Sequence, residues 1–421
     1  MALPRLAASL RPRRLPPQLA HQIADGDRGR PFWRHPATIA AAALALTLGA
    51  VPLLPDGGQR DEGAIAPAGE STGAPGAVGR GRLTARMRAE IDRVVAEGAA
   101  LGSAQGRTAR ARAAVRCATF EGQRYCLGFG WTNQSAEALA ARLETRPRLE
   151  RERTGDLDAD GLLARASRRT EEERIEAETA ELTTAARSVG KVWLLRHEVQ
   201  GVPLPEGFAE RHPEVASQVA ATDVQARGGF GGSYPERSKI LTSKVAQAQN
   251  TTYWCGPAAM QAIGWGSQEK RKNQSYWARR LGTTTAGTAI TDMVRVINNK
   301  THYDDADHAG PYVVVDISDF TFKQWYRLMM RHVHDYRAPV VLHPVLLKQY
   351  YPYLDDDASG HFQVGRGFDQ NPGGTPQLGW FEPWDQSRFD PSEPAIGRVQ
   401  WRNAYRSYRA NLDHFQHNIG V

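Results

Sequence analysis

The chain carries very little net charge outside its first 37 residues. Seven arginines and two aspartates give residues 1–37 a net charge of +5, and the whole sequence has +7. The remaining 384 residues therefore carry only +2, which is 7 minus 5. Proteins that bind nucleic acid usually gather basic side chains on one face to meet the phosphates. A nearly neutral folded part therefore argues against nucleic acid as a partner.

Cysteine is scarce, with three in 421 residues. Cys117 and Cys126 flank a segment that is typical of a tight hairpin turning at Glu121 and Gly122. Pairing outward from this turn places the two cysteines opposite each other, within reach of a disulfide. No histidine or further cysteine stands at metal-ligand spacing from them. We therefore predict a disulfide, provided that the chain is exported, and Cys255 remains as the unpaired thiol.

Long apolar runs are also rare, and residues 38–55 form the one that contains no charge. This run directly follows the basic stretch of residues 1–37, which is the order found in export signals and signal anchors. A buried core helix is the alternative. We expect the chain to lie outside the cytoplasm of a bacterium, either extracellular or anchored by residues 38–55 on the outer face of the cytoplasmic membrane.

The rest of the chain divides by composition. Residues 56–82 are rich in Gly, Ala, Pro and Ser and are typical of a flexible linker. Residues 83–227 should be mainly helical around the Cys117 hairpin, and the dense charge of residues 134–188 predicts solvated helices. The glycines at 228–232 make a plausible boundary to a second domain, residues 228–421. The region 83–227 could be a targeting domain, an inhibitory pro-segment or a lid; if inhibitory, its removal should raise activity.

Residues 228–421 change from helical to strand-like patterns along their length. We expect helices over 257–265, 276–281 and 289–298. Apolar β-branched runs then predict strands over 311–316, 339–343, 361–369 and 376–381. Helices followed by antiparallel strands are typical of the α+β fold class.

Cys255 lies at the predicted start of a helix, because Pro257 suits a first turn and alanines follow it. The positive end of a helix favours a thiolate, which is the nucleophilic form of cysteine. A buried cysteine that serves only as a small apolar side chain is the alternative. Gln249, six residues upstream, could fold its amide back to hold an oxyanion together with the Cys255 backbone N–H.

His361 is the candidate base, at the mouth of a predicted strand. If the following hairpin is centred between Asn371 and Pro372, Glu382 falls opposite His361, close enough to orient the imidazole. Asp385 and Asp369 are the substitutes for this acid.

The acidic runs 304–307 and 355–357 lack calcium-loop spacing and are interpreted as solvated loops, although the second could bias His361 toward its charged form. His343 is interpreted as a core histidine.

Together these residues resemble the bacteriocin-processing-like branch of papain-like cysteine peptidases, the C39 group. The resemblance rests on Gln249 before Cys255-Gly-Pro, on Gly360-His361 opening a strand, and on Glu382-Pro383 where the family usually has Asp-Pro. It also covers a middle segment, residues 276–288. The resemblance implies a papain-like fold, with Gln249 as the oxyanion residue, Cys255 as nucleophile, His361 as base and Glu382 as orienting acid. The transporter segments of the bacteriocin-exporting members are absent.

The sequence therefore predicts an exported cysteine peptidase that cleaves peptide or isopeptide bonds through an acyl-enzyme. The expected partners are peptide or protein substrates, including cell-wall peptide, and neither a metal nor an organic cofactor is required. Two alternatives stay open. One is an acyl transferase that uses the same residues, and the other is a non-catalytic peptidase-like module that binds protein or cell-wall peptide.

Overall fold

The structure is a computed structural model that describes residues 78–145, 152–219, 234–267 and 271–421. All of these belong to one compact unit. The predicted basic segment, apolar run and domain boundary at 228–232 lie outside the described residues, as does most of the predicted linker. Within the described part, no helix has the length and apolar character needed to cross a membrane.

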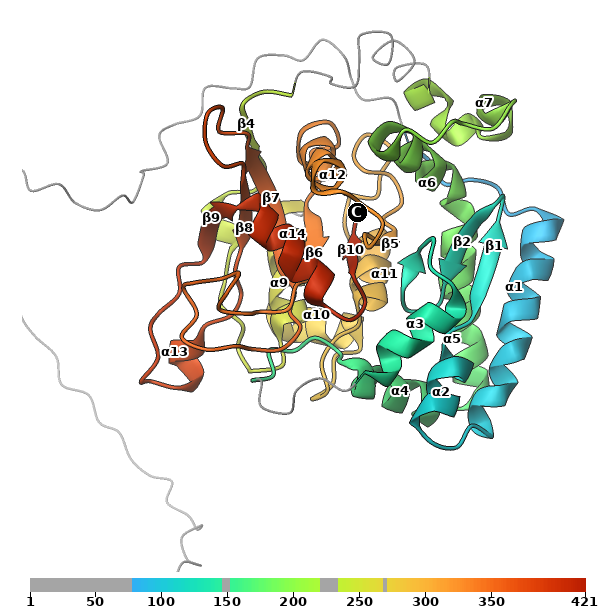
Figure 1. Cartoon of the computed structure of the whole chain (residues 1–421), viewed down its shortest axis with the longest axis horizontal. Coiled ribbons are helices and arrows are strands. Elements are labelled where there is room, and N and C mark those ends of the chain that lie inside the picture. The colour runs from blue at the N-terminus through green and yellow to red at the C-terminus, as the bar shows by residue number, and fades with distance from the viewer. Residues whose placement is uncertain (1–77, 146–151, 220–233, 268–270) are drawn as a thin grey trace, which may run out of the picture. The chain divides into compact units, whose positions relative to one another are not determined.

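The region that was expected to be mainly helical contains helices on both sides of a short hairpin. Its elements are α1 Ala85–Glu97, α2 Arg107–Ala114, β1 Cys117–Phe120, β2 Gln123–Cys126, β3 Gly130–Trp131, α3 Ala136–Glu144, α4 Ala159–Arg168, α5 Glu171–Arg187, α6 Val189–Leu195 and α7 Phe208–Arg211. The first helix buries Met87, Ile91, Val94 and Val95, which recur at helical spacing. It packs beside the hairpin (Figure 1).

The predicted hairpin and its disulfide are confirmed. Cys117 is paired directly with Cys126 in the antiparallel ladder of β1 and β2, and the two sulfurs are bonded. Glu121 and Gly122 form the turn, and both have positive φ angles of 49° and 82°. Glycine tolerates such angles without steric cost, which explains the tight reversal at this point.

Helices and strands alternate in the second half of the chain more than the sequence analysis predicted. The elements are β4 Arg237–Lys239, α9 Cys255–Ser267, α10 Gln274–Leu281, α11 Ile290–Lys300, β5 Val314–Asp316, α12 Phe322–His334, β6 Val340–Leu342, β7 Gln363–Asp369, β8 Gln377–Phe381, α13 Gln386–Phe389, β9 Val399–Asn403, α14 Ala404–Asp413 and β10 Asn418–Gly420. The seven predicted elements are all present. The additional helices are those that connect or follow strands.

One mixed sheet runs through both halves of the chain, in the order β1-β2-β3-β5-β10-β6-β7-β8-β9, with β4 also paired to β7. The expectation of an antiparallel sheet confined to the second half was wrong in one respect. Strand β3 pairs in parallel with β5 through Trp131 and Val315, and thereby adds the disulfide hairpin to the sheet. A parallel partner from far upstream leaves no local pattern in the sequence, since only a nearby turn signals a pairing.

Alternate residues of the central strands enter two separate cores. Val313 and Val315 pack in one cluster with α12 residues, while Val314 packs in a second cluster with residues of α9 and α11. Val341 likewise joins the second cluster, between neighbours that join the first. Because successive side chains of a strand point to opposite faces, the sheet is covered by helices on both faces. The α+β class predicted from the sequence is confirmed, and both ends of β7 are fixed in a packed interior.

The charge-dense helices are less solvated than expected. Helix α5 begins with the capping box of Thr170 and Glu173, and its first turn is exposed. Further along, however, Arg174 and Glu178 are buried. Glu178 accepts hydrogen bonds from both Arg174 and Arg116, which explains how these charges tolerate burial.

Candidate active site

Cys255 is the first residue of α9, where the sequence analysis placed it. Pro257 lies in the first turn, and its missing N–H costs nothing there. Gly256 is needed for packing, because a Cβ at this position would lie 2.6 Å from the Thr288 hydroxyl oxygen. The Cys-Gly-Pro motif therefore starts a helix and lets that start approach the loop that contains Thr288.

The thiol of Cys255 is fully buried. The backbone N–H groups of Phe362 and Gly256 favour the charged form of its sulfur, and Phe362 directly follows His361. Burial raises the pKa of Cys255 well above its usual value, and the carboxylates of Asp156 and Glu382 add to the rise. The expectation that the helix end would by itself favour a thiolate is thus wrong for this conformation, because the loss of solvation outweighs the two N–H groups.

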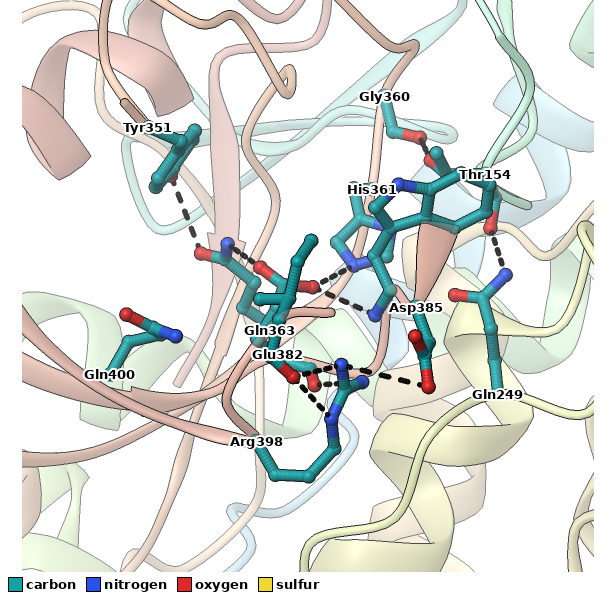
Figure 2. A network of polar contacts seen from close by, with 12 residues as sticks. Thr154, Gln249, Tyr351, Gly360, His361, Gln363, Glu382, Asp385, Arg398 and Gln400 are labelled. Atoms are coloured by element: carbon teal, nitrogen blue, oxygen red, sulfur yellow. Dashed lines mark hydrogen bonds and ion pairs between the residues drawn. The ribbon is translucent and has the colours of Figure 1, made fainter. Parts of the chain in front are cut away.

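His361 and Glu382 are in direct contact. The Nε2 atom of His361 lies 2.8 Å from Oε1 of Glu382, and both side chains are fully buried (Figure 2). Because the carboxylate accepts, Nε2 carries the proton and Nδ1 is left with its lone pair. Nδ1 is buried and has no hydrogen-bond partner among the described residues. This is the tautomer that a general base requires.

Glu382 is held by four donors in all. Oε1 also accepts from the Trp384 backbone N–H at 2.9 Å, and Oε2 accepts from Gln363 at 2.7 Å and from the Tyr353 hydroxyl at 2.8 Å. Burial alone would raise the pKa of Glu382, but the attraction of His361 and these hydrogen bonds outweigh it and lower that pKa. The carboxylate therefore stays ionised beside the imidazole. Tyr353 and Gln363 were not identified from the sequence.

The predicted contact of His361 with Glu382 is present, but the register that led to it was wrong. Asp369 is paired with Gln377, and a bulge near Gly365 shifts the ladder so that Val364 is paired with Phe381. Continued by one residue, this register places Gln363 opposite Glu382. His361 lies before the strand and reaches the carboxylate by side-chain length. The turn is wider than a two-residue hairpin, and a local bulge is difficult to infer from sequence.

The two substitute acids do not contact His361. Asp369 pairs with Arg237 and accepts from the Asn371 backbone. Asp385 accepts from the Ser387 hydroxyl and lies 3.9 Å from Arg398. The same figure shows Asp385 turned toward Arg398 (Figure 2). Glu382 is therefore the acid that the fold brings to the histidine.

Gln249 is buried beside this pair and is tied to it through the backbone. Its N–H donates to the Pro383 carbonyl at 2.8 Å, directly after Glu382. The side-chain Nε2 lies 3.1 Å from the Thr154 carbonyl oxygen, and the Thr251 and Thr252 carbonyls are also within hydrogen-bond distance. The amide therefore points at a carbonyl of the chain itself (Figure 2). Whether it also holds an oxyanion remains a prediction.

A second buried polar group lies next to this site. The Asp156 carboxylate accepts hydrogen bonds from the Nε2 atoms of His343 at 2.7 Å and His414 at 2.8 Å. The other ring nitrogen of His343 faces the Asn418 side-chain oxygen, so the prediction of a satisfied core histidine is confirmed. The three ligand atoms lie close enough for a metal ion. The hydrogen bonds already account for both carboxylate oxygens, and the acidic run at 355–357 contacts Lys348 rather than His361.

This group should make the fold sensitive to acid. Burial is the main reason that the pKa of His414 falls to about 4, well below an ordinary histidine near 6.5. The unfolded chain takes up a proton as the pH falls through 6.5, while folded His414 does not. Its stabilising contribution is thus complete above pH 6.5 and is lost as the pH falls toward 4, by about 2–3 kcal/mol at pH 4.5.

Urea unfolding at pH 7.5 and pH 4.5 measures this loss. In His414→Gln the amide still donates to Asp156 but does not titrate, so the difference between the two pH values should shrink by about that amount. An unchanged difference would show that His414 does not resist protonation in the folded chain.

Comparison with known proteins agrees with the site. The sequence model of the Peptidase_C39 like family matches residues 244–406. This range contains Gln249, Cys255, His361 and Glu382, the four residues on which the resemblance was based. No curated protein and no solved structure matches the chain. The predicted resemblance is thereby confirmed over residues 244–406, which match the C39-like peptidase family, and this family suggests a cysteine peptidase type of function.

Proposed function

We propose that the chain is an exported cysteine peptidase that cleaves peptide or isopeptide bonds, with Cys255 as nucleophile and His361 as base. The observation that carries the proposal is the His361–Glu382 contact at 2.8 Å, which leaves the unpaired Nδ1 as the basic nitrogen. The backbone N–H of Phe362, the next residue after this base, favours the charged form of the Cys255 sulfur. The export signal rests on the sequence of residues 38–55.

The reaction would proceed as in other thiol hydrolases. His361 takes the thiol proton, the Cys255 sulfur attacks the substrate carbonyl, and Gln249 helps to hold the negative oxygen. The proton then passes to the leaving amine as the peptide bond breaks. Water attacks the thioester and restores the thiol. Attack by an amine instead of water would make the same site an acyl transferase.

A second candidate function is favoured by one observation. The thiol is fully buried and its pKa is raised, which also fits a non-catalytic module that binds protein or cell-wall peptide. The two functions differ in whether a reactive thiolate forms once peptide enters the site.

Cleavage of an unbiased peptide library by the full chain tests the proposal. We expect Cys255→Ala to lower the cleavage rate by at least about 1,000-fold, because the nucleophile is lost. The cleaved products should define a substrate class. Equal product formation by the wild type and Cys255→Ala, with peptide binding retained, would favour the non-catalytic module.

A further inference from the structure

Residues 152–157, which come from the region upstream of the family match, are hydrogen-bonded to Gln249 and to the two residues just before His361. Ser359 donates its backbone N–H to the Glu152 carbonyl at 2.7 Å. On the opposite side, Thr288 donates to the Gly155 carbonyl and accepts from the Leu157 N–H, both at 2.9 Å. The segment therefore forms an isolated bridge on each side of a bend at Gly155, and these backbone hydrogen bonds are of the kind that hold a peptide ligand in a groove.

Thr154 lies at the centre of this segment. Its hydroxyl donates to the Gly360 carbonyl at 2.7 Å, and its N–H donates to the Ser359 hydroxyl at 3.1 Å. Its own carbonyl accepts from the Gln249 side chain at 3.1 Å. Figure 2 shows Thr154 between Gly360 and Gln249, joined to each by a dashed line. The Thr154 carbonyl therefore accepts from the Gln249 side-chain amide, which is the group that was predicted to hold the substrate oxyanion.

Residue 155, which follows Thr154, has to be glycine. A Cβ on Gly155 would lie 2.5 Å from the backbone carbon of Tyr253, two residues before Cys255. Gly155 also has a φ angle of +114°, which other residues rarely adopt. The wall of the site at this position is backbone, so it cannot move aside as a flexible side chain would.

The residue after Gly155 is Asp156, and its surroundings suit an acidic side chain. Asp156 inserts its carboxylate between His343 and His414, and all three are buried. Neither histidine carries a catalytic role in the proposed reaction, and both come from elements outside the segment. Their two Nε2 atoms hold the carboxylate at 2.7 and 2.8 Å.

We propose that residues 152–157 are a built-in peptide ligand of the active site, which binds peptides with a small hydroxylated residue, then a glycine at a bend, then an acidic residue. The segment covers the site in cis and slows the entry of peptide, so the wild type cleaves slowly and a chain with a displaced segment cleaves faster. This inference rests on the proposed function for the identity of the site, but its first test does not require activity. It also agrees with the burial of Cys255, since Gly155 of the segment lies against the backbone of Tyr253, two residues before the thiol.

The test measures how fast iodoacetamide alkylates Cys255 in the full chain. The other two cysteines form the disulfide, so mass spectrometry reads a single free thiol. Gly155→Ala should dislodge the segment and raise the alkylation rate by at least about tenfold over the wild type. Gly106→Ala is the matched control, because Gly106 has a similar positive φ of +81° with no atom within 4 Å of the added Cβ. It should label at the wild-type rate.

Thr154→Val provides a milder second variant that keeps the side-chain shape. It removes the hydroxyl bond to Gly360 and should raise the rate about threefold to tenfold, as expected for one lost hydrogen bond. Circular dichroism and thermal unfolding establish that each variant is folded. If both variants label at the wild-type rate, the segment does not cover the thiol and the inference is wrong.

A synthetic peptide Glu-Arg-Thr-Gly-Asp-Leu tests the ligand class. Added to Gly155→Ala, it should slow alkylation toward the wild-type rate, while the same peptide with alanine in place of glycine should not. Equal protection by both peptides, or by neither, would overturn the proposed specificity. Faster labelling of Gly155→Ala without hydrolysis of any peptide would keep the inference and reject the peptidase function.

Discussion

Peptide hydrolysis by the unblocked Gly155→Ala chain should fall about 10,000-fold when Glu382 is replaced by alanine. Glu382 fixes the Nε2 proton of His361, and loss of the orienting acid of a catalytic triad typically has an effect of about this size. Glu382→Gln offers Nε2 a side-chain amide that can donate a hydrogen bond instead of accepting one, which favours the wrong tautomer of His361, so we expect a loss of similar size.

The controls separate positioning from folding. Removal of the carboxylate also leaves Gln363 and Tyr353 without their acceptor, so Glu382→Ala should lose stability by about 3–5 kcal/mol. The assay is therefore run below the unfolding temperature of every variant, and kcat is measured apart from KM. Asp385→Ala, which removes an acid that does not touch His361, should leave kcat within about threefold. A much smaller loss from Glu382→Gln than from Glu382→Ala would indicate that a neutral acceptor for the Nε2 proton is sufficient and that the carboxylate charge is not required.

Replacement of Glu178 by alanine should destabilise the chain by about 3–5 kcal/mol, although Glu178 is far along the chain from the active site. Glu178 accepts from Arg116 and Arg174, and these guanidinium groups also bind the carbonyls of Val94 and Val95 at the end of α1. Without the carboxylate, the buried charge of Arg116 loses its acidic partner, and Arg174 keeps only the exposed Glu171 at 3.9 Å. Urea unfolding at pH 7 measures the loss.

Glu176 provides the matched control on the same helix. It is exposed, and Glu176→Ala should change the free energy of unfolding by no more than about 0.5 kcal/mol. A loss below about 1 kcal/mol for Glu178→Ala would mean that the network is solvated, as the sequence pattern had indicated.

Local signals in the sequence predicted those features that depend on neighbouring residues. The Cys117–Cys126 pairing follows from one tight turn, and the start of α9 follows from Pro257. Helix α12 was missed although Thr321 and Gln324 carry the capping-box pattern and form that box in the structure. The sequence therefore contains a local signal for the start of this helix.

The features that were missed depend on contacts between distant parts of the chain. Asp156 meets His343 and His414 across 187 and 258 residues, and neither spacing leaves a periodic trace. The burial of Arg174 and Glu178 likewise depends on Arg116, which lies on another element. Charge density alone predicts solvent exposure, and it fails where opposite charges are paired in the interior.

The parallel pairing of β3 with β5 limits how the upstream region can be studied. Between β10 on one side and β3 on the other, β5 is an interior strand. A chain shortened to begin after residue 227 would lose β1, β2 and β3 and turn β5 into an open edge with unsatisfied backbone groups. Such edges recruit other chains, so the shortened protein should self-associate. Deletion would then mimic loss of function by aggregation, and release of the blocked site has to be sought with point substitutions in the intact chain.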